Sequence, residues 1–281
     1  MRVHLVKALG RIRLDRLTAL DIDRMLAAKE RDGLSPQTCV NLRAALRSAM
    51  SFAARKGLVV QNVVKLSEPV KVRRYEARYL TRQEARQLLD AASTERLAAL
   101  YNVAIALGLR QGEILGLQWS AVDFDRRRLQ VKTQAQRVKG KGIEFRDPKW
   151  HSNRTVVLPD VIVFSLRAHK HRQAQERLLA GGKWLDYDLV FTTTIGTPIS
   201  ASNLVRRNFK PLLTRAELPS ELRFQDLRHS AATLLLAQGV PMRVVSQVLG
   251  HSTMRVTERY AAVVPELYED AAAAMDRALG S

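Results

Sequence analysis

Two stretches decide how this chain folds: FQDLRHSAATLLLAQGV at residues 224–240 and VLGHSTMRVTERYAAV at residues 248–263. We expect a tail helix after these stretches, from Pro265 to Leu279, whose apolar stripe is too short to make a core alone. The end of the chain is therefore expected to be helical, with earlier helices that begin near Gln225, Pro241 and Thr253.

Working outward, the preceding residues are also expected to be mostly helical, with a small β insertion. A helix from about Glu95 to Leu107 ends at Gly108. Alternating runs predict short antiparallel strands at 122–124, 129–131 and 155–158, and further helices at 160–179 and 202–215. The expected fold class is therefore mainly α with a small antiparallel β-sheet.

Residues 1–65 are predicted to form a separate helical unit. Ser35 and Pro36 are typical of a helix start, and Gly57 is typical of a helix end. Between them, apolar residues recur at spacings of three and four and predict a buried stripe of Cys39, Leu42, Leu46, Ala49 and Ala53.

A basic linker is expected at residues 66–76. The stretch from Ser67 to Arg78 reads SEPVKVRRYEAR, with one proline, four basic residues and no apolar face. Thr81 and Glu84 then form a capping box that opens the next helix. We therefore expect a boundary near residue 76 and a second unit, which includes the tail helix, at residues 77–281.

The charge balance indicates a polyanionic partner. Lys and Arg number 46 against 27 Asp and Glu, which gives a net charge of +19. Membrane surfaces are also anionic, but no apolar run approaches the roughly 20 residues that a bilayer span needs. Basic residues among the first 14 argue against a signal peptide, and the single Cys39 excludes an internal disulfide. A cytoplasmic protein that acts on nucleic acid is expected.

Some of the basic residues are candidates for phosphate contact. Arg43 and Arg47 lie one helical turn apart, away from the buried stripe, where solvated side chains and phosphate ligands are about equally expected. The full set of candidate DNA-binding residues is Arg43, Arg47, Lys71, Arg73, Arg74, Arg206, Arg207 and Lys210.

Four segments carry a resemblance to a known family. Besides the two quoted above, they are ALGLRQGEILGLQWSAVDF at 106–124 and PKWHSNRTVVLP at 148–159. In their order along the chain, the four segments are similar to the signatures of tyrosine recombinases of the phage-integrase type. The resemblance implies a two-domain clamp around duplex DNA. It also implies that Glu113 is the carboxylate that supports Arg110. The catalytic residues that it implies are Arg110, Lys149, Arg228, His251 and Tyr260.

Phosphodiester exchange explains why these residue types occur together. The five-coordinate phosphorus carries negative charge on its non-bridging oxygens, which two planar, permanently charged guanidiniums can bind. Tyrosine is a weak nucleophile at neutral pH, so its reactivity must come from the phosphate and its cationic clamp. Lys149 can protonate the departing 5′-hydroxyl. Neither a metal nor any other cofactor is expected, because the arginines take the metal's role and the phosphotyrosyl link conserves bond energy.

The chain departs from the family pattern at two places. Gln225 stands where the family's His-x-x-Arg motif has histidine, and its amide can donate a hydrogen bond but cannot exchange a proton. The chain also starts inside what resembles the core-binding domain, so the resemblance implies either a fragment or a simplified integrase that has no amino-terminal arm-binding domain.

The resemblance implies a site-specific recombinase that acts on double-stranded DNA at specific attachment sites. Homo-tetramers on synapsed DNA and an accessory directionality factor are the expected partners, in a bacterial host cell. Two alternatives remain open: a Xer-like recombinase for chromosome or plasmid resolution, and a catalytically weakened DNA-binding relative. A relaxing topoisomerase would share the chemistry, but no residue selects it.

Overall fold

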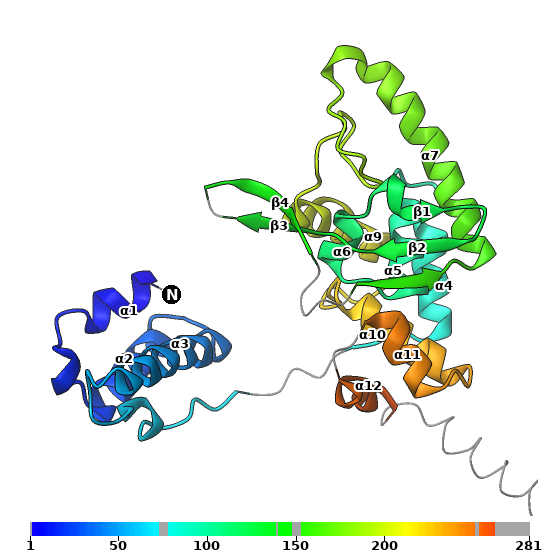
Figure 1. Cartoon of the computed structure of the whole chain (residues 1–281). Coiled ribbons are helices and arrows are strands. Elements are labelled where there is room, and N and C mark those ends of the chain that lie inside the picture. Colours follow the sequence, from blue (N-terminus) through cyan, green and yellow to red (C-terminus); the bar gives the residue numbers. More distant parts are fainter. Residues whose placement is uncertain (1, 73–77, 139, 148–152, 251–252, 262–281) are drawn as a thin grey trace, which may run out of the picture. The chain divides into compact units, whose positions relative to one another are not determined.

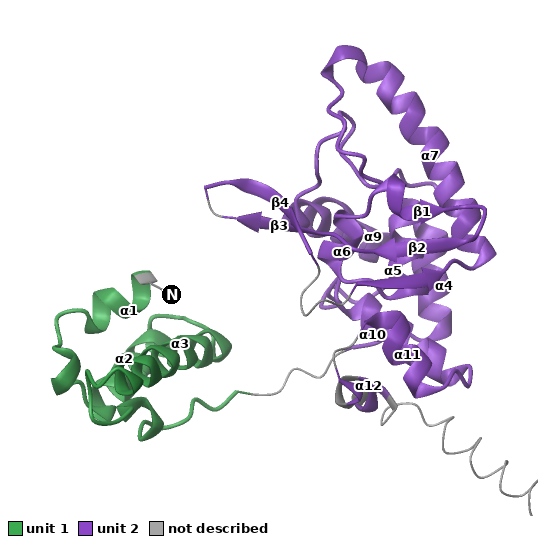
Figure 2. Cartoon of the chain, viewed as in Figure 1, with its two compact units in different colours: residues 1–76 green, residues 77–281 purple. Residues whose placement is uncertain are grey.

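The computed structural model describes residues 2–72, 78–138, 140–147, 153–250 and 253–261 (Figure 1). The chain divides into two compact units, residues 1–76 and residues 77–281 (Figure 2). Within the described ranges, no helix combines the length and the apolar character that crossing a membrane requires. The predicted tail helix from Pro265 to Leu279 lies outside the described residues.

The first unit is a small helical bundle. It contains α1 (Arg2–Leu9), α2 (Ala19–Arg31) and α3 (Pro36–Arg55), with single 3₁₀ turns at Leu14–Arg16 and Val63–Lys65. The predicted start of α3 is confirmed, because Ser35 Oγ accepts from the backbone N–H of Thr38 and Pro36 occupies the first turn. The predicted stripe is wrong at one position: Met50 is buried, whereas Ala49 is exposed.

The second unit begins with helices that surround one apolar helix. It opens with α4 (Arg82–Ala92), whose predicted capping box of Thr81 and Glu84 is confirmed. Next come α5 (Ala98–Leu107) and the short α6 (Gln111–Leu115). α5 is buried on nearly all sides and packs against α4, α7 (Asp160–Ala180) and α10 (Asp226–Ala237), so it forms the centre of the core.

Two small antiparallel sheets follow α6. One has the order β1 (Val122–Asp123), β2 (Arg128–Val131) and β5 (Arg154–Val157), with the buried side chains of Leu129 and Val156 paired. These are the three strands that the sequence predicts. The second sheet, a hairpin of β3 (Gln134–Val138) and β4 (Gly142–Arg146), was not predicted.

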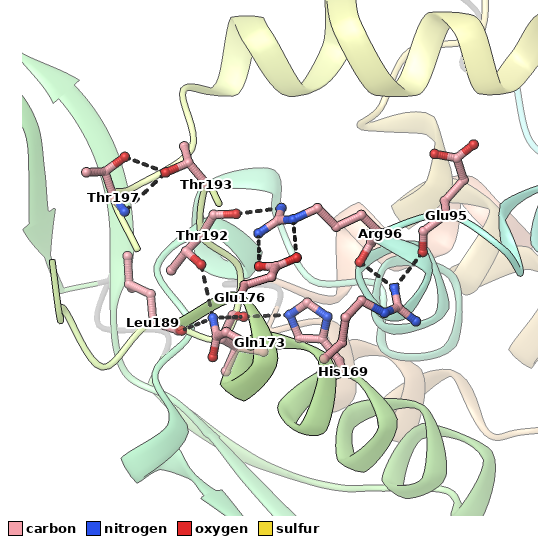
Figure 3. Close-up of polar contacts among 11 residues, drawn as sticks. Glu95, Arg96, His169, Gln173, Glu176, Leu189, Thr192, Thr193 and Thr197 are labelled. Carbon is pink, nitrogen blue, oxygen red and sulfur yellow. Dashed lines mark hydrogen bonds and ion pairs between the residues drawn. The ribbon is translucent and has the colours of Figure 1, made fainter. Parts of the chain in front are cut away.

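Polar side chains attach α7 to an irregular segment at residues 189–192. His169, Gln173 and Glu176 recur on one face of α7, and Figure 3 shows them directed toward this segment and Arg96. Gln173 Nε2 donates to the carbonyls of Leu189 and Val190, and Glu176 forms an ion pair with Arg96 at 2.6 Å. The network supplies partners for backbone groups that no sheet satisfies.

The remaining helices complete the unit. A nearly continuous helical stretch runs through α8 (Ala201–Asn203), a π-helical turn at Leu204–Phe209 and α9 (Lys210–Arg215). Then α10 (Asp226–Ala237), α11 (Met242–Leu249) and α12 (Met254–Ala261) pack on one another around a second apolar cluster. The fold class predicted from the sequence, mainly α with a small antiparallel sheet, is confirmed.

Candidate active site

Arg110 is placed by the sharp end of α5. Gly108 ends this helix with a φ of +57°, and a Cβ at this position would lie 2.3 Å from a methyl carbon of Leu249. Two residues later the chain enters α6, where the Glu113 carboxylate accepts from both the backbone N–H of Arg110, at 3.0 Å, and its Nη1, at 2.7 Å. Arg110 Nη2 donates to the carbonyl of Gly250. The guanidinium is therefore fixed from two sides.

A second arginine, Arg154, shares the same carboxylate. Arg154 lies at the start of β5 with its side chain 9% exposed, and its Nη2 is 3.0 Å from Glu113 Oε2. Its Nε donates to the carbonyl of Val248 at the end of α11. Burial raises the pKa of Glu113, but hydrogen bonds and charges from Arg154 and Arg110 outweigh burial and keep this pKa below its usual value. Sequence reasoning missed Arg154.

Replacing Arg154 with methionine should lower the free energy of unfolding by about 3–5 kcal/mol, because the substitution leaves the Glu113 carboxylate buried with one partner fewer. Urea unfolding followed by tryptophan fluorescence measures the loss. Arg177→Met is the matched control: its ion pair with Asp186 is exposed on both sides, and its loss should cost about 1 kcal/mol or less. Equal losses in the two variants would contradict the importance of the buried pair.

Arg228 lies deeper than either of these arginines. It is on the first turn of α10, is 3% exposed, and donates from Nη1 to the carbonyl of Gly108 at 2.7 Å. Its Nη2 is buried without a hydrogen-bond partner among the described residues. Burial, and then the charge of Arg110, lower the pKa of Arg228 to about 9. A buried guanidinium with an unused donor is suited to bind an anion.

Tyr260 enters the site from α12. Its ring is 9% exposed and packs in the apolar cluster of α10 and α11, which includes Ala231, Leu236 and Leu249. Its hydroxyl lies 2.6 Å from Nδ1 of His229, on the turn of α10 that carries Arg228. The charge of Tyr260 acts on the pKa of Arg228, so the two groups are within electrostatic range. Sequence reasoning named Tyr260 but gave His229 no role.

The structure does not test every predicted catalytic residue. Gln225 is exposed and immediately precedes α10, three residues before Arg228. Lys149 and His251 lie outside the described residues. Gly250, the neighbour of His251, has a φ of +68°, and a Cβ there would lie 2.7 Å from Arg154 Nη1. The chain before His251 is thus held against the arginines.

The predicted DNA contacts divide into three groups. Two of these residues have structural partners: Arg43 donates to Ser67 and to the carbonyl of Val64, and the Lys210 ammonium donates to the carbonyls of Ser220 and Leu222. Both side chains are therefore held by the chain itself, and their contact with DNA stays a prediction. Arg73 and Arg74 lie outside the described residues. The others, which are exposed, are Arg47, Lys71, Arg206 and Arg207.

Comparison with known proteins identifies the family. Residues 78–266 match the Phage integrase family. A tyrosine recombinase XerC-like protein of Caldanaerobacter subterraneus subsp. tengcongensis is 32% identical over 269 residues, which cover 89% of this chain and 68% of that protein. An integrase of Streptomyces ambofaciens is 34% identical, over 97% of this chain and 72% of that protein.

Solved structures show the same fold at low sequence identity. The Tn1549 transposon integrase in complex with transposon right end DNA has a TM-score of 0.80 at 21% identity, covering 98% of this chain and 90% of that chain. A lambda integrase dimer bound to a core site has a TM-score of 0.62 at 20% identity, covering 92% of this chain and 84% of that chain. The chain belongs to the phage integrase family and is a tyrosine-type site-specific recombinase. The resemblance inferred from the four motifs is thus confirmed.

Proposed function

We propose that this chain cleaves and rejoins duplex DNA through a 3′-phosphotyrosyl link to Tyr260, with Arg110 and Arg228 as the clamp on the scissile phosphate. The observation that carries the proposal is the unused Nη2 of buried Arg228, near both Arg110 and Tyr260. A phosphate oxygen would supply the missing partner. It would also offset part of the positive charge that Arg110, Arg154 and Arg228 bring together around the Glu113 carboxylate.

The proposed reaction uses the clamp twice. In cleavage, the Tyr260 oxygen attacks phosphorus and the 5′-oxygen leaves. In rejoining, a 5′-hydroxyl attacks the phosphotyrosyl link and releases Tyr260. Fixed guanidiniums stabilise the charge on the non-bridging oxygens in both steps, because they need no reorganisation when that charge develops. We assign Lys149 as the proton donor to the 5′-oxygen, and His251 and Gln225 as hydrogen-bond donors to the phosphate.

We further propose a function for each part of the chain. Residues 1–65 act as the core-binding domain, residues 66–76 as a basic linker, and residues 77–281 as the catalytic domain with its tail helix. The net charge of +19 favours double-stranded DNA as the partner, and the matching Tn1549 and lambda integrase structures contain DNA. Specific attachment sites, a homo-tetramer on two duplexes, an accessory directionality factor and a bacterial cytoplasm complete the proposal.

The alternative biological task is Xer-like resolution of chromosomes or plasmids, which uses the same chemistry. The relatives include both proteins named XerC and proteins named integrase, so they support either task. Sequencing the DNA that is joined in cells distinguishes them. Junctions between two different replicons indicate integration, and junctions between two copies of one site indicate resolution.

Covalent capture tests the proposed chemistry. A pool of nicked duplexes with randomised flanks is incubated with the protein, and species that survive denaturation are isolated and sequenced. Digestion and mass spectrometry then locate the DNA-bearing residue. A nucleotide on Tyr260 supports the proposal. Failure to capture any duplex, or capture on another residue, would overturn it.

The linker proposal predicts a change in salt dependence. Neutralising Lys71, Arg73 and Arg74 together should lower the slope of log affinity against log salt concentration by roughly 2–3, because each lost phosphate contact releases about 0.9 fewer counterions. Fluorescence anisotropy with duplex DNA measures the slope. An unchanged slope would show that these residues do not contact the phosphate backbone. Neutralising the exposed Glu30 is the control, because it changes the charge of the same unit without removing a cation and should not lower the slope.

The proposed place of Gln225 predicts different cleavage rates for two substitutions. Gln225→Ala should slow single-turnover cleavage, because it removes a hydrogen-bond donor to the phosphate. Gln225→His should match or exceed the parent rate, since a charged donor is roughly twice as strong as a neutral one. The captured duplex serves as the substrate at pH 7. Parent-like cleavage by Gln225→Ala would place Gln225 outside the active site.

A further inference from the structure

A base lies within hydrogen-bond distance of the Tyr260 hydroxyl oxygen. His229 Nδ1 lies 2.6 Å from this oxygen, a short hydrogen bond, and the two rings have centroids 5.4 Å apart. Because His229 directly precedes Ser230 and follows Arg228 on α10, the helix that carries a clamp arginine also carries the partner of the nucleophile. A packing contact alone would not require a nitrogen lone pair to meet the reactive oxygen.

We propose that His229 is the general base of strand cleavage, which takes the phenolic proton from Tyr260 as this residue attacks phosphorus. The inference rests on the proposed role of Tyr260 as nucleophile and adds the destination of its proton. Gln225, at the motif position that carries histidine in the family, cannot fill this role because an amide does not accept a proton near neutral pH.

A buried carboxylate sets the tautomer of His229. Asp226 is 1% exposed and its Oδ1 lies 4.0 Å from His229 Nε2, one turn earlier on the same helix. The Asp226 carboxylate is held in place because its Oδ2 accepts from the backbone N–H of Arg223 at 2.8 Å. A negative charge beside Nε2 favours the proton on that nitrogen. Nδ1 is then left with its lone pair directed at Tyr260.

The surroundings also keep His229 neutral, as a base must be before the reaction. Burial lowers the pKa of His229 below its usual value, Asp226 opposes this effect, and the charge of Arg228 adds to it. Asp226 and Arg228 on its own helix and Tyr260 on α12 are the ionisable groups of the described site that act on this ring.

The protons balance over the full cycle. In cleavage, the bond between the Tyr260 oxygen and phosphorus forms while the bond from phosphorus to the 5′-oxygen breaks. The phenolic proton passes to His229 Nδ1, and the leaving oxygen receives a proton from the donor assigned to Lys149. In rejoining, the 5′-hydroxyl returns its proton to that donor, and the imidazolium of His229 returns a proton to the departing Tyr260 oxygen. No net proton, oxidant or cofactor is required.

Two substitutions separate this role from packing. His229→Asn keeps an acceptor near the position of Nδ1 but cannot hold a proton, and His229→Phe keeps a ring without an acceptor. The substrate is the nicked duplex selected by covalent capture on the parent protein, and single-turnover adduct formation is followed between pH 5 and pH 9. Duplex affinity and thermal unfolding are measured for each variant, so that a variant with altered folding is recognised.

Both variants should form the adduct about 100-fold or more slowly at pH 7, with unchanged duplex affinity. Because the pKa of His229 is lowered, the parent rate should hold through the usual imidazole value of about 6.5 and fall only at lower pH, and this decline should be absent in His229→Asn. A duplex with sulfur in place of the scissile 5′-oxygen has a leaving group that needs no proton. Because His229 is proposed to act as a base and not as the donor to this group, the sulfur duplex should not restore the rate of adduct formation of either variant.

Three outcomes would overturn the inference. One is a parent-like rate and pH profile for His229→Asn, which would leave His229 a structural hydrogen-bond partner. Another is rescue by the sulfur-containing duplex, which would make His229 an acid rather than a base. The third is an adduct rate for His229→Phe within a few-fold of the parent. If the parent forms no adduct with any duplex, the proposed function itself fails, and the two failures are therefore distinguishable.

Discussion

Tyr260→Phe should bind duplex DNA nearly as tightly as the parent and form no covalent adduct. The substitution removes one oxygen, the atom proposed to attack phosphorus, and keeps the ring in its apolar cluster with α10 and α11. Loss of the hydrogen bond to His229 should cost only about 0.5–1.5 kcal/mol of stability. Denaturing gels after incubation with the nicked duplex measure the adduct, and gel-shift titration measures binding.

Tyr187→Phe is the matched control for this experiment. Tyr187 lies in the same unit, is 45% exposed, and should lose its hydroxyl without effect on the adduct. An adduct that persists in Tyr260→Phe would show that another residue attacks the phosphate. Loss of DNA binding together with the adduct would show that the Tyr260 hydroxyl contributes to affinity, contrary to a role confined to chemistry.

Local signals account for what could be predicted of the fold. The capping box of Thr81 and Glu84 and the serine–proline start at residue 35 depend on residues within one helical turn, so the sequence shows them directly. The β3–β4 hairpin carries a local signal only at its turn, where Gly140 and Gly142 both have positive φ. Its strands are polar and half-exposed, and their register follows from backbone pairing such as Gln136 with Glu144 rather than from an apolar alternation.

The site residues that belong to the four sequence motifs could be predicted, but the contacts between residues far apart in the sequence could not. The ion pair of Arg154 with Glu113 joins residues 41 positions apart, and the contact of His229 with Tyr260 joins residues 31 apart. Arg43 shows the same limit in reverse: it lies on the polar face of its helix as expected, but its guanidinium is used by Ser67, 24 residues later. The spacing of residues along the chain predicts the face of a helix on which a charged side chain lies, but the partner of that side chain depends on the tertiary structure.

Arg228→Met should reduce the rate of adduct formation by about 10²–10³-fold, the usual effect of losing one preorganised donor to a transition state. It should do so without lowering thermal stability. The lowering of the Arg228 pKa from its ordinary value to about 9 is equivalent to roughly 4–5 kcal/mol against the charged form in the folded chain. The substitution also costs the Gly108 carbonyl its donor, which is worth about 1–3 kcal/mol. The larger effect favours methionine.

The dependence of stability on pH gives this prediction its sign. Because the pKa of Arg228 is lower in the folded than in the unfolded chain, the unfolded chain binds more protons above about pH 9, and the stability of the parent rises with pH there. Below about pH 9 the cost of the buried charge is fully present. The stability advantage of Arg228→Met should therefore be greatest near neutral pH and should shrink as pH rises above 9.

Arg154→Met makes the comparison decisive, since it is the same substitution at a neighbouring buried guanidinium. Arg154 is paired with the Glu113 carboxylate, whereas Arg228 Nη2 has no hydrogen-bond partner among the described residues. Thermal unfolding at pH 7 should therefore show a large loss for Arg154→Met and none for Arg228→Met. Equal losses would mean that Arg228 is already fully compensated in the free protein. Its unused donor would then not be kept for a phosphate, and the observation that carries the proposed function would lose its force.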